Sequence, residues 1–219
     1  MVFALVIATF LAAVAVDALV IKRLAEKKAK VLAKREAIDQ YIAPKVEEAQ
    51  DLLFHQGHTW VRVLRAVVEI GFDDFTKRLV GEVTKIEAPE VGARVVKGKK
   101  AWTIHFGDRT LTQLAPITGR VIEVNRELVE KPTSFGGSVY KNSWIVKILP
   151  EALASEVPDL YTPSRFLKWI DMQKARLVQE SFPELGMAYG DGATMKDGAA
   201  REIDAAKWQQ IAKKLFGAN

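Results

Sequence analysis

The chain has 219 residues, of which 49% are hydrophobic and 27% charged, and its formal net charge is +5. This length suits one folded domain with extensions or two small domains, and the composition allows a real hydrophobic core. The absence of cysteine excludes disulfides, thiolate metal sites and cysteine nucleophiles.

The first element in chain order is an apolar run over residues 2–21, interrupted only by Thr9 and Asp17. A helix of this length measures about 30 Å, the thickness of a bilayer core. A cleaved signal peptide is an alternative, since Ala13–Ala15 resembles a cleavage site, but no basic residues precede the run. A buried helix is the other alternative, although so apolar an N-terminal run would be unusual in a core. We predict a transmembrane helix over residues 1–21.

A basic segment follows the apolar run. Seven lysines and arginines lie between Lys22 and Arg35, against Glu26 within this stretch and Glu36 directly after it. Basic residues favour the cytoplasmic side, so we predict a single-pass membrane protein with its N-terminus outside and its globular domain in the cytoplasm. Asp17 either reaches the lipid interface or pairs with a neighbouring subunit. The predicted membrane or partner contacts are Asp17, Lys22, Arg23, Lys27 and Lys28. We expect no nucleic-acid binding, because no pattern of stacking aromatic residues accompanies the basic segment.

The remaining chain predicts an α+β fold. Residues 22–41 and 45–54 read as helical, and strands are predicted at residues 60–64, 83–86, 101–106 and 119–124. A short helix over 72–79 interrupts the strands, and two helices end the chain, one from Thr162–Pro163 to Ser181 and one over 200–216. Short strands separated by turns indicate a small barrel or sandwich. The predicted boundaries are 1–21 for the membrane helix, 22–54 for a basic helical linker, 55–152 for the β domain and 153–219 for a helical extension.

Several blocks in the β region resemble one known family in order and spacing. They are His58–Val61, Ile70–Phe75, Gly81–Val83, Pro89–Gly92, Lys97–Gly98 and Pro116–Asn125, followed by Leu128, Pro132, Tyr140, Trp144 and Pro150. Together they resemble the H-protein of the glycine cleavage system. This resemblance implies a hybrid β-barrel, the barrel-sandwich of lipoyl domains, with small helices around it.

The same resemblance implies a cofactor site at the tip of a hairpin, where the family attaches lipoate to a lysine through an amide. Counting ten residues from Gly98, or eight back from Pro116, places this position at Asp108. Asp108 cannot form the amide, and neither can Arg109, whose guanidinium does not deprotonate. Gly107–Asp108 nevertheless suits a two-residue hairpin turn. We therefore expect the hairpin without its reactive group, and no cofactor.

No other pattern predicts chemistry. The three histidines, His55, His58 and His105, are expected to be structural and not metal ligands. No catalytic constellation is visible, so we do not expect an enzyme or a small-molecule substrate.

Two functions remain open. The first is a non-catalytic structural or adaptor subunit of a membrane-associated complex, with other protein subunits and membrane lipid as partners. The second is a docking or regulatory partner of lipoate-dependent or sulfur-transfer enzymes.

Overall fold

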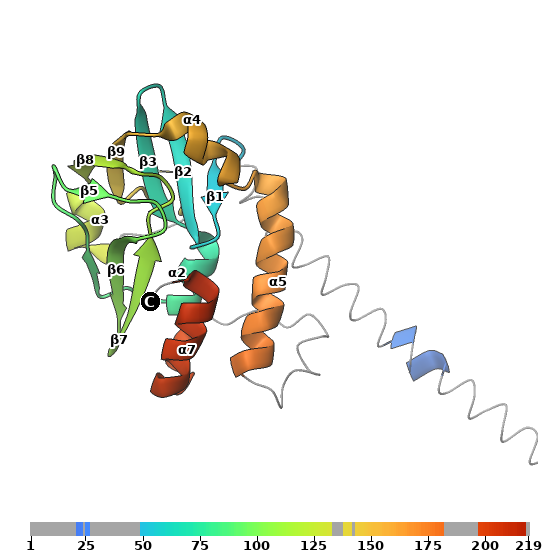
Figure 1. Ribbon diagram of the computed structural model, residues 1–219. Coiled ribbons are helices and arrows are strands. Elements are labelled where there is room, and N and C mark those ends of the chain that lie inside the picture. Colours follow the sequence, from blue (N-terminus) through green and yellow to red (C-terminus); the bar gives the residue numbers. More distant parts are fainter. Residues whose placement is uncertain are drawn as a thin grey trace, which may run out of the picture.

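The computed structural model describes residues 21–23, 25–26, 49–132, 138–141, 143–181 and 197–217. Two antiparallel sheets and a set of helices make up these residues (Figure 1). The six-stranded sheet has the order β1-β2-β3-β9-β8-β5, and the three-stranded sheet has the order β4-β6-β7. The strands are β1 (Leu53–His55), β2 (Thr59–Leu64), β3 (Val67–Phe72), β4 (Lys85–Glu87), β5 (Arg94–Val95), β6 (Lys100–Phe106), β7 (Arg109–Leu114), β8 (Gly119–Val124) and β9 (Val146–Pro150). This is the predicted H-protein-like barrel-sandwich.

The core lies on the inner face of the six-stranded sheet, where side chains alternate strictly with those of the outer face. Val61, Ile70 and Val146 occupy one cross-strand row, and each is at most 1% exposed. The neighbouring row, Arg62–Glu69–Lys147, points to the opposite face. A shift of one residue in register would exchange these two rows, so the hydrophobic pattern determines the pairing.

Helices pack around the barrel, and three of them begin at a residue whose side chain caps the helix: Asp73, Asn125 and Asp204. The structure contains α2 (Asp74–Val80), α3 (Arg126–Glu130), α4 (Leu153–Glu156), η2 (Val157–Asp159), α5 (Pro163–Ser181), η4 (Ala199–Arg201) and α7 (Ala205–Phe216). The Asp73 carboxylate accepts a hydrogen bond from the Thr76 amide at 2.8 Å and caps α2. This agrees with the helix predicted over 72–79.

The C-terminal helices pack on the barrel and on each other. Figure 1 shows α5 and α7 beside the strands on one side of the molecule. The Phe166 ring of α5 stacks on Phe54 of β1 at a centroid distance of 4.0 Å. Trp208 of α7 meets Phe106 of β6 edge-on at 5.5 Å. The helical extension therefore shares one hydrophobic core with the β domain.

The predicted single-pass membrane localisation is wrong. Across the described ranges, no helix combines the length and the apolar character needed to cross a membrane. The longest of them, α5, has 19 residues but carries charges such as Arg165, Lys168 and Asp171 along its length. The predicted span over residues 2–21 lies outside the described residues except for Ile21.

A second correction concerns the helix predicted over residues 45–54. Leu53 and Phe54 belong to strand β1, which pairs with β2. The Phe54 backbone also exchanges hydrogen bonds of 2.9 and 2.7 Å with Tyr161, which precedes α5. Tertiary pairing thus overrides a local pattern that reads as helical.

Candidate functional site: the Gly107–Asp108 hairpin

The predicted hairpin is formed by β6 and β7 and turns at Gly107 and Asp108. Phe106 pairs with Arg109, so two residues make the turn. Gly107 has φ +60°, the left-handed conformation that the first position of a type II′ turn requires. The Asp108 side chain is 88% exposed. The side chain presented at the turn is therefore an exposed carboxylate.

Arg109 does not share this exposure. Its side chain is 12% exposed, with Nε 3.6 Å from Oδ1 of Asp108. Its Nη1 donates to the carbonyl oxygen of Ala200 in η4. The guanidinium therefore holds the hairpin to η4 and is not presented at the tip.

The lysines nearest in sequence lie at the far end of the hairpin. Lys100 begins β6 and pairs with Leu114, and Lys99 precedes it. Six residue steps separate Lys100 from Phe106, about 20 Å at the rise of a β-strand. Neither amine is near the turn.

Residues 197–217, termed here the C-terminal segment, line one side of this hairpin. The Gly198 amide donates to the Arg78 carbonyl at 2.7 Å, and Arg201 donates to the Glu82 carbonyl at 2.6 Å. Further along, Trp208 Nε1 donates to the Thr110 carbonyl of β7 at 3.2 Å. The first two bonds hold the segment to α2 and to Glu82. The third, together with the Arg109 contact, holds it to the hairpin next to the turn.

Two of the three histidines, His55 and His58, are buried. His58 is fully buried, and its Nδ1 lies 2.7 Å from Oδ2 of Asp73. Its ring centroid lies within 5 Å of those of Phe75, Trp169 and Phe216, from α2, α5 and α7. His58 thus connects the barrel to both C-terminal helices.

His55 is a hydrogen-bond acceptor in the turn after β1. Its Nδ1 accepts from the Gly57 amide at 2.9 Å. Burial lowers the pKa of His55 to about 4, with smaller contributions from the charges of Lys97 and His58. The imidazole is therefore neutral at pH 7.

The third histidine, His105, is partly exposed on β6, with Nε2 3.1 Å from Oε1 of Glu87. Within the described ranges, no three His, Asp or Glu residues converge as a metal site would require. Of the predicted contacts near the N-terminus, Lys22 and Arg23 are exposed, and Asp17, Lys27 and Lys28 lie outside the described residues.

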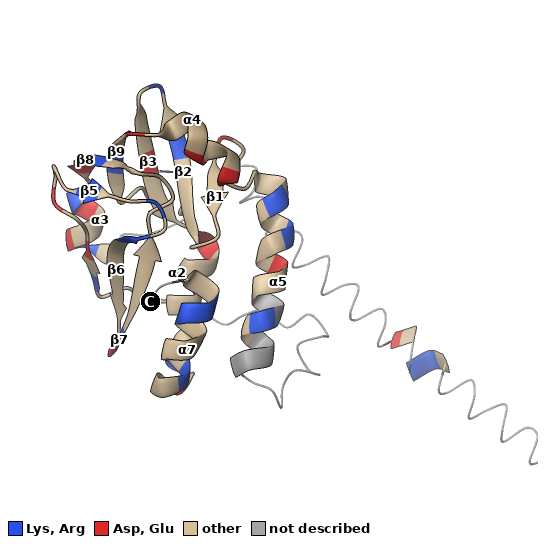
Figure 2. Ribbon diagram, viewed as in Figure 1, with Lys and Arg blue, Asp and Glu red and all other residues tan. Residues whose placement is uncertain are grey.

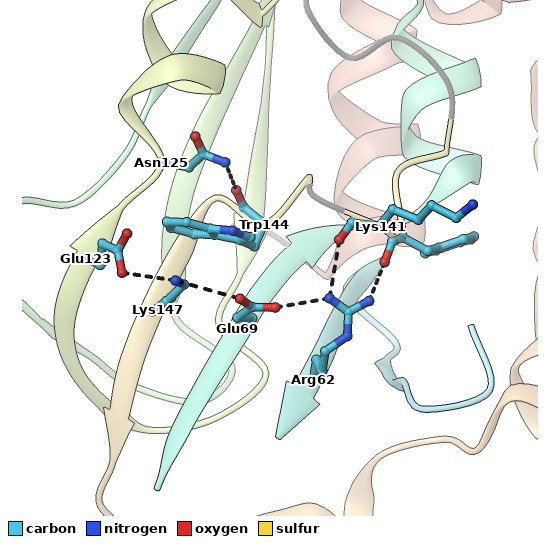
Figure 3. Close-up of polar contacts among 8 residues, drawn as sticks. Arg62, Glu69, Glu123, Asn125, Lys141, Trp144 and Lys147 are labelled. Carbon is cyan, nitrogen blue, oxygen red and sulfur yellow. Dashed lines mark hydrogen bonds and ion pairs between the residues drawn. The ribbon is translucent and has the colours of Figure 1, made fainter. Parts of the chain in front are cut away.

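A second polar arrangement, which sequence reasoning missed, crosses the outer face of the six-stranded sheet (Figure 3). Glu69 lies between two cations, 3.0 Å from Arg62 and 3.8 Å from Lys147. Lys147 also contacts Glu123 at 3.0 Å and lies 4.2 Å from the ring centroid of Trp144. These charges lie on four strands, and strand register alone brings them together. Arg62 and Glu123 lie in predicted strands, but Glu69 and Lys147 do not, so no local pattern indicated this pairing.

Several known proteins similar to this chain are glycine cleavage H proteins. The family model for "Glycine cleavage H-protein" matches residues 52–172. A glycine cleavage system H protein of Anoxybacillus flavithermus is 35% identical over 123 residues, which are 56% of this chain and 95% of the relative. The mitochondrial glycine cleavage system H protein 3 of Arabidopsis thaliana is 32% identical over 58% of this chain and 75% of its own length.

A solved structure agrees at the level of the fold. The crystal structure of a glycine cleavage system H protein from Mycobacterium marinum aligns with a TM-score of 0.51 and 21% identity. It covers 56% of this chain and 98% of the other. The family match ends at residue 172, within α5, so η4 and α7 lie beyond it.

Proposed function

The chain belongs to the glycine cleavage H-protein family, and we propose that it is a non-catalytic adaptor, which binds protein partners and carries no lipoyl group. The observation that carries this proposal is the hairpin tip. A lipoyl group needs a primary amine for its amide bond, and the tip presents the Asp108 carboxylate in its place. The residues present at this position therefore do not fit the group.

The surroundings of the tip support the same proposal. Arg109 is held by Ala200, and the lysines at the far end of β6 lie about 20 Å from the turn. A hairpin held along one side by the C-terminal segment is suited to a rigid binding surface. The partners that we propose are other protein subunits of a complex.

Intact-mass spectrometry of the full chain, co-expressed with a lipoate ligase, tests the proposal directly. We expect the native chain to carry no added mass. Asp108→Lys is expected to gain one lipoyl group, because the turn remains exposed and now offers an amine. Asp108→Ala serves as the matched control and stays unmodified.

Two outcomes would count against the proposal. A lipoyl mass on the native chain would show that it is a carrier. Failure of Asp108→Lys to react, beside an authentic H protein that does react, would show that the hairpin tip is not the attachment position.

A second function, a docking or regulatory partner of lipoate-dependent enzymes, is favoured by the family match over residues 52–172. Such a partner would bind glycine cleavage enzymes through surfaces that the family shares. Titration of the unmodified chain against a purified lipoate-dependent enzyme of the glycine cleavage system separates the two roles. An adaptor for other subunits leaves the turnover of an authentic H protein unchanged, whereas a regulator competes with it.

A further inference from the structure

The outer face of the six-stranded sheet carries two neighbouring cross-strand rows. The first is the Arg62–Glu69–Lys147–Glu123 ladder of Figure 3, whose charges compensate one another. The second lies on the same face, two residues away along β2, β3 and β9, and the bulge in β8 places Arg120 in it. It contains Leu64, Val67, Leu149, Arg120 and Arg94, and we call it the Leu–Arg row.

The apolar half of the Leu–Arg row is exposed. Leu64 is 44% and Leu149 50% accessible, although Val68 and Ile148, on the opposite face of the sheet, are fully buried. Ile122, 43% accessible, lies beside them at a β-bulge in β8. Single exposed leucines are ordinary on protein surfaces, but two in one cross-strand row, with the half-buried Val67 between them, form an apolar strip suited to an interaction surface.

The bulge at Ile122 also turns a charge toward this row. It shifts the register of β8 by one residue, so that Arg120, and not the buried Val121, lies opposite Leu149. Bulges commonly redirect a side chain in this way. Arg120 therefore borders the exposed leucine directly.

Two arginines face each other at this end of the row, an arrangement that costs stability because like charges repel. Arg94 is compensated by Glu151, whose carboxylate it contacts at 2.7 Å. The hydrogen bond from Arg94 lowers the pKa of Glu151, as do the charges of Arg94 and Arg120. Arg120 itself donates one hydrogen bond, to the Gly92 carbonyl at 2.8 Å, and forms no ion pair within the described ranges.

A third arginine borders the other end of the row. Arg65 follows Leu64 in the two-residue turn between β2 and β3, at φ +54°. Glycine is the usual residue at such a position, and a bulky side chain there is strained. Arg65 is exposed and has no ion-pair partner in the part of the chain that the structure describes. In Figure 2, basic positions mark the β2–β3 turn and the strands β5 and β8.

We propose that the Leu–Arg row is a docking surface for an acidic amphipathic helix of a partner protein. The apolar face of that helix covers Leu64, Val67 and Leu149, and its carboxylates pair with Arg120 and Arg65. Arginine suits this task because its planar guanidinium binds a carboxylate through two hydrogen bonds. A second copy of this chain does not fit, since it would bring the same basic border against itself. This docking surface rests on the proposed adaptor role and specifies where its partner binds and with which chemistry.

Two synthetic helical peptides test the inference. Both have leucine on one face, and the other face is glutamate in one peptide and lysine in the other. Titration into the ¹⁵N-labelled full chain is expected to show binding of the glutamate peptide, with shifts at Leu64, Val67 and Leu149. Leu149→Glu and Arg120→Glu are each expected to weaken that binding about tenfold, and Arg120→Glu also to gain affinity for the lysine peptide. Met172→Glu, at an exposed residue of α5, is the matched control and leaves binding unchanged.

The turn offers a variant that separates binding from folding. Arg65→Gly relieves the strain of the positive φ, so we expect it to raise the melting temperature. It should also lower the affinity for the glutamate peptide, because a guanidinium is lost. Equal affinity for both peptides, or shifts outside the Leu–Arg row, would overturn the inference. Concentration-dependent shifts at these leucines without peptide, with a dimer in sedimentation, would assign the surface to a second copy instead. A lipoyl group on the native chain would overturn the adaptor proposal alone and leave these binding results interpretable.

Discussion

At the residue scale, His55 makes the stability of this protein depend on pH. In the unfolded chain its pKa is the ordinary value of 6.5, and in the folded chain burial lowers it to about 4. Between these two pH values the unfolded state binds a proton that the folded state does not bind. The free energy of unfolding is therefore highest above pH 6.5 and falls toward pH 4. A shift of this size corresponds to a loss of about 3 kcal/mol. Urea unfolding at several pH values measures this loss of unfolding free energy.

His55→Asn is the variant for this prediction, because its side-chain oxygen can accept the Gly57 amide hydrogen as Nδ1 does. We expect its stability to fall less steeply with acid than that of the native chain. Gln56→Ala changes an exposed neighbour of His55 that carries no titratable group, and should retain the native pH profile. Parallel profiles for His55→Asn and the native chain would contradict the role assigned to His55.

At the element scale, α7 depends on its N-cap. The Asp204 carboxylate accepts hydrogen bonds from the amides of Ala206 and Lys207 at 3.0 and 3.1 Å. We expect Asp204→Ala to lower the free energy of unfolding by about 1 kcal/mol, because two amide groups lose their acceptor. Asp204→Asn retains an acceptor and should cost only a few tenths of that loss. Urea unfolding, followed by circular dichroism, distinguishes them, and equal losses for the two variants would refute the capping role.

At the scale of the whole molecule, α7 and the β6–β7 hairpin are expected to unfold together. Trp208 is 2% exposed, packs on Phe106 and donates to Thr110, so it belongs to the barrel core. We expect Trp208→Ala to cost about 3–5 kcal/mol, as truncation of a buried aromatic side chain does. The amides of β6 and β7 should then lose protection from hydrogen exchange along with those of α7.

Gln209→Ala is the matched control, since Gln209 is the exposed neighbour of Trp208 on the same helix. Substitution there should change stability by less than about 0.5 kcal/mol. A Trp208→Ala chain in which α7 opens while the hairpin amides stay protected would show two separate units.

The fold could be predicted largely from local signals. The helix over 72–79 and the strands over 101–106 and 119–124 each depend on a few neighbouring residues, so a linear reading captures them. The hairpin tip at Gly107–Asp108 was predicted for the same reason and is confirmed as a two-residue turn. Strand β1 was missed because its hydrogen bonds come from β2 and Tyr161, distant partners that leave no local mark.

The sequence by itself determined the family resemblance, the barrel-sandwich and the carboxylate at the hairpin tip, since these depend on residue identity and short spacings. Only the tertiary structure decided that the C-terminal segment lines that hairpin and that His58 joins three helices to the barrel. It alone brought Arg120 beside Leu149, because a single bulge in β8 sets the register there. Contacts between residues far apart in the chain depend on packing and strand register, and no linear pattern encodes either one.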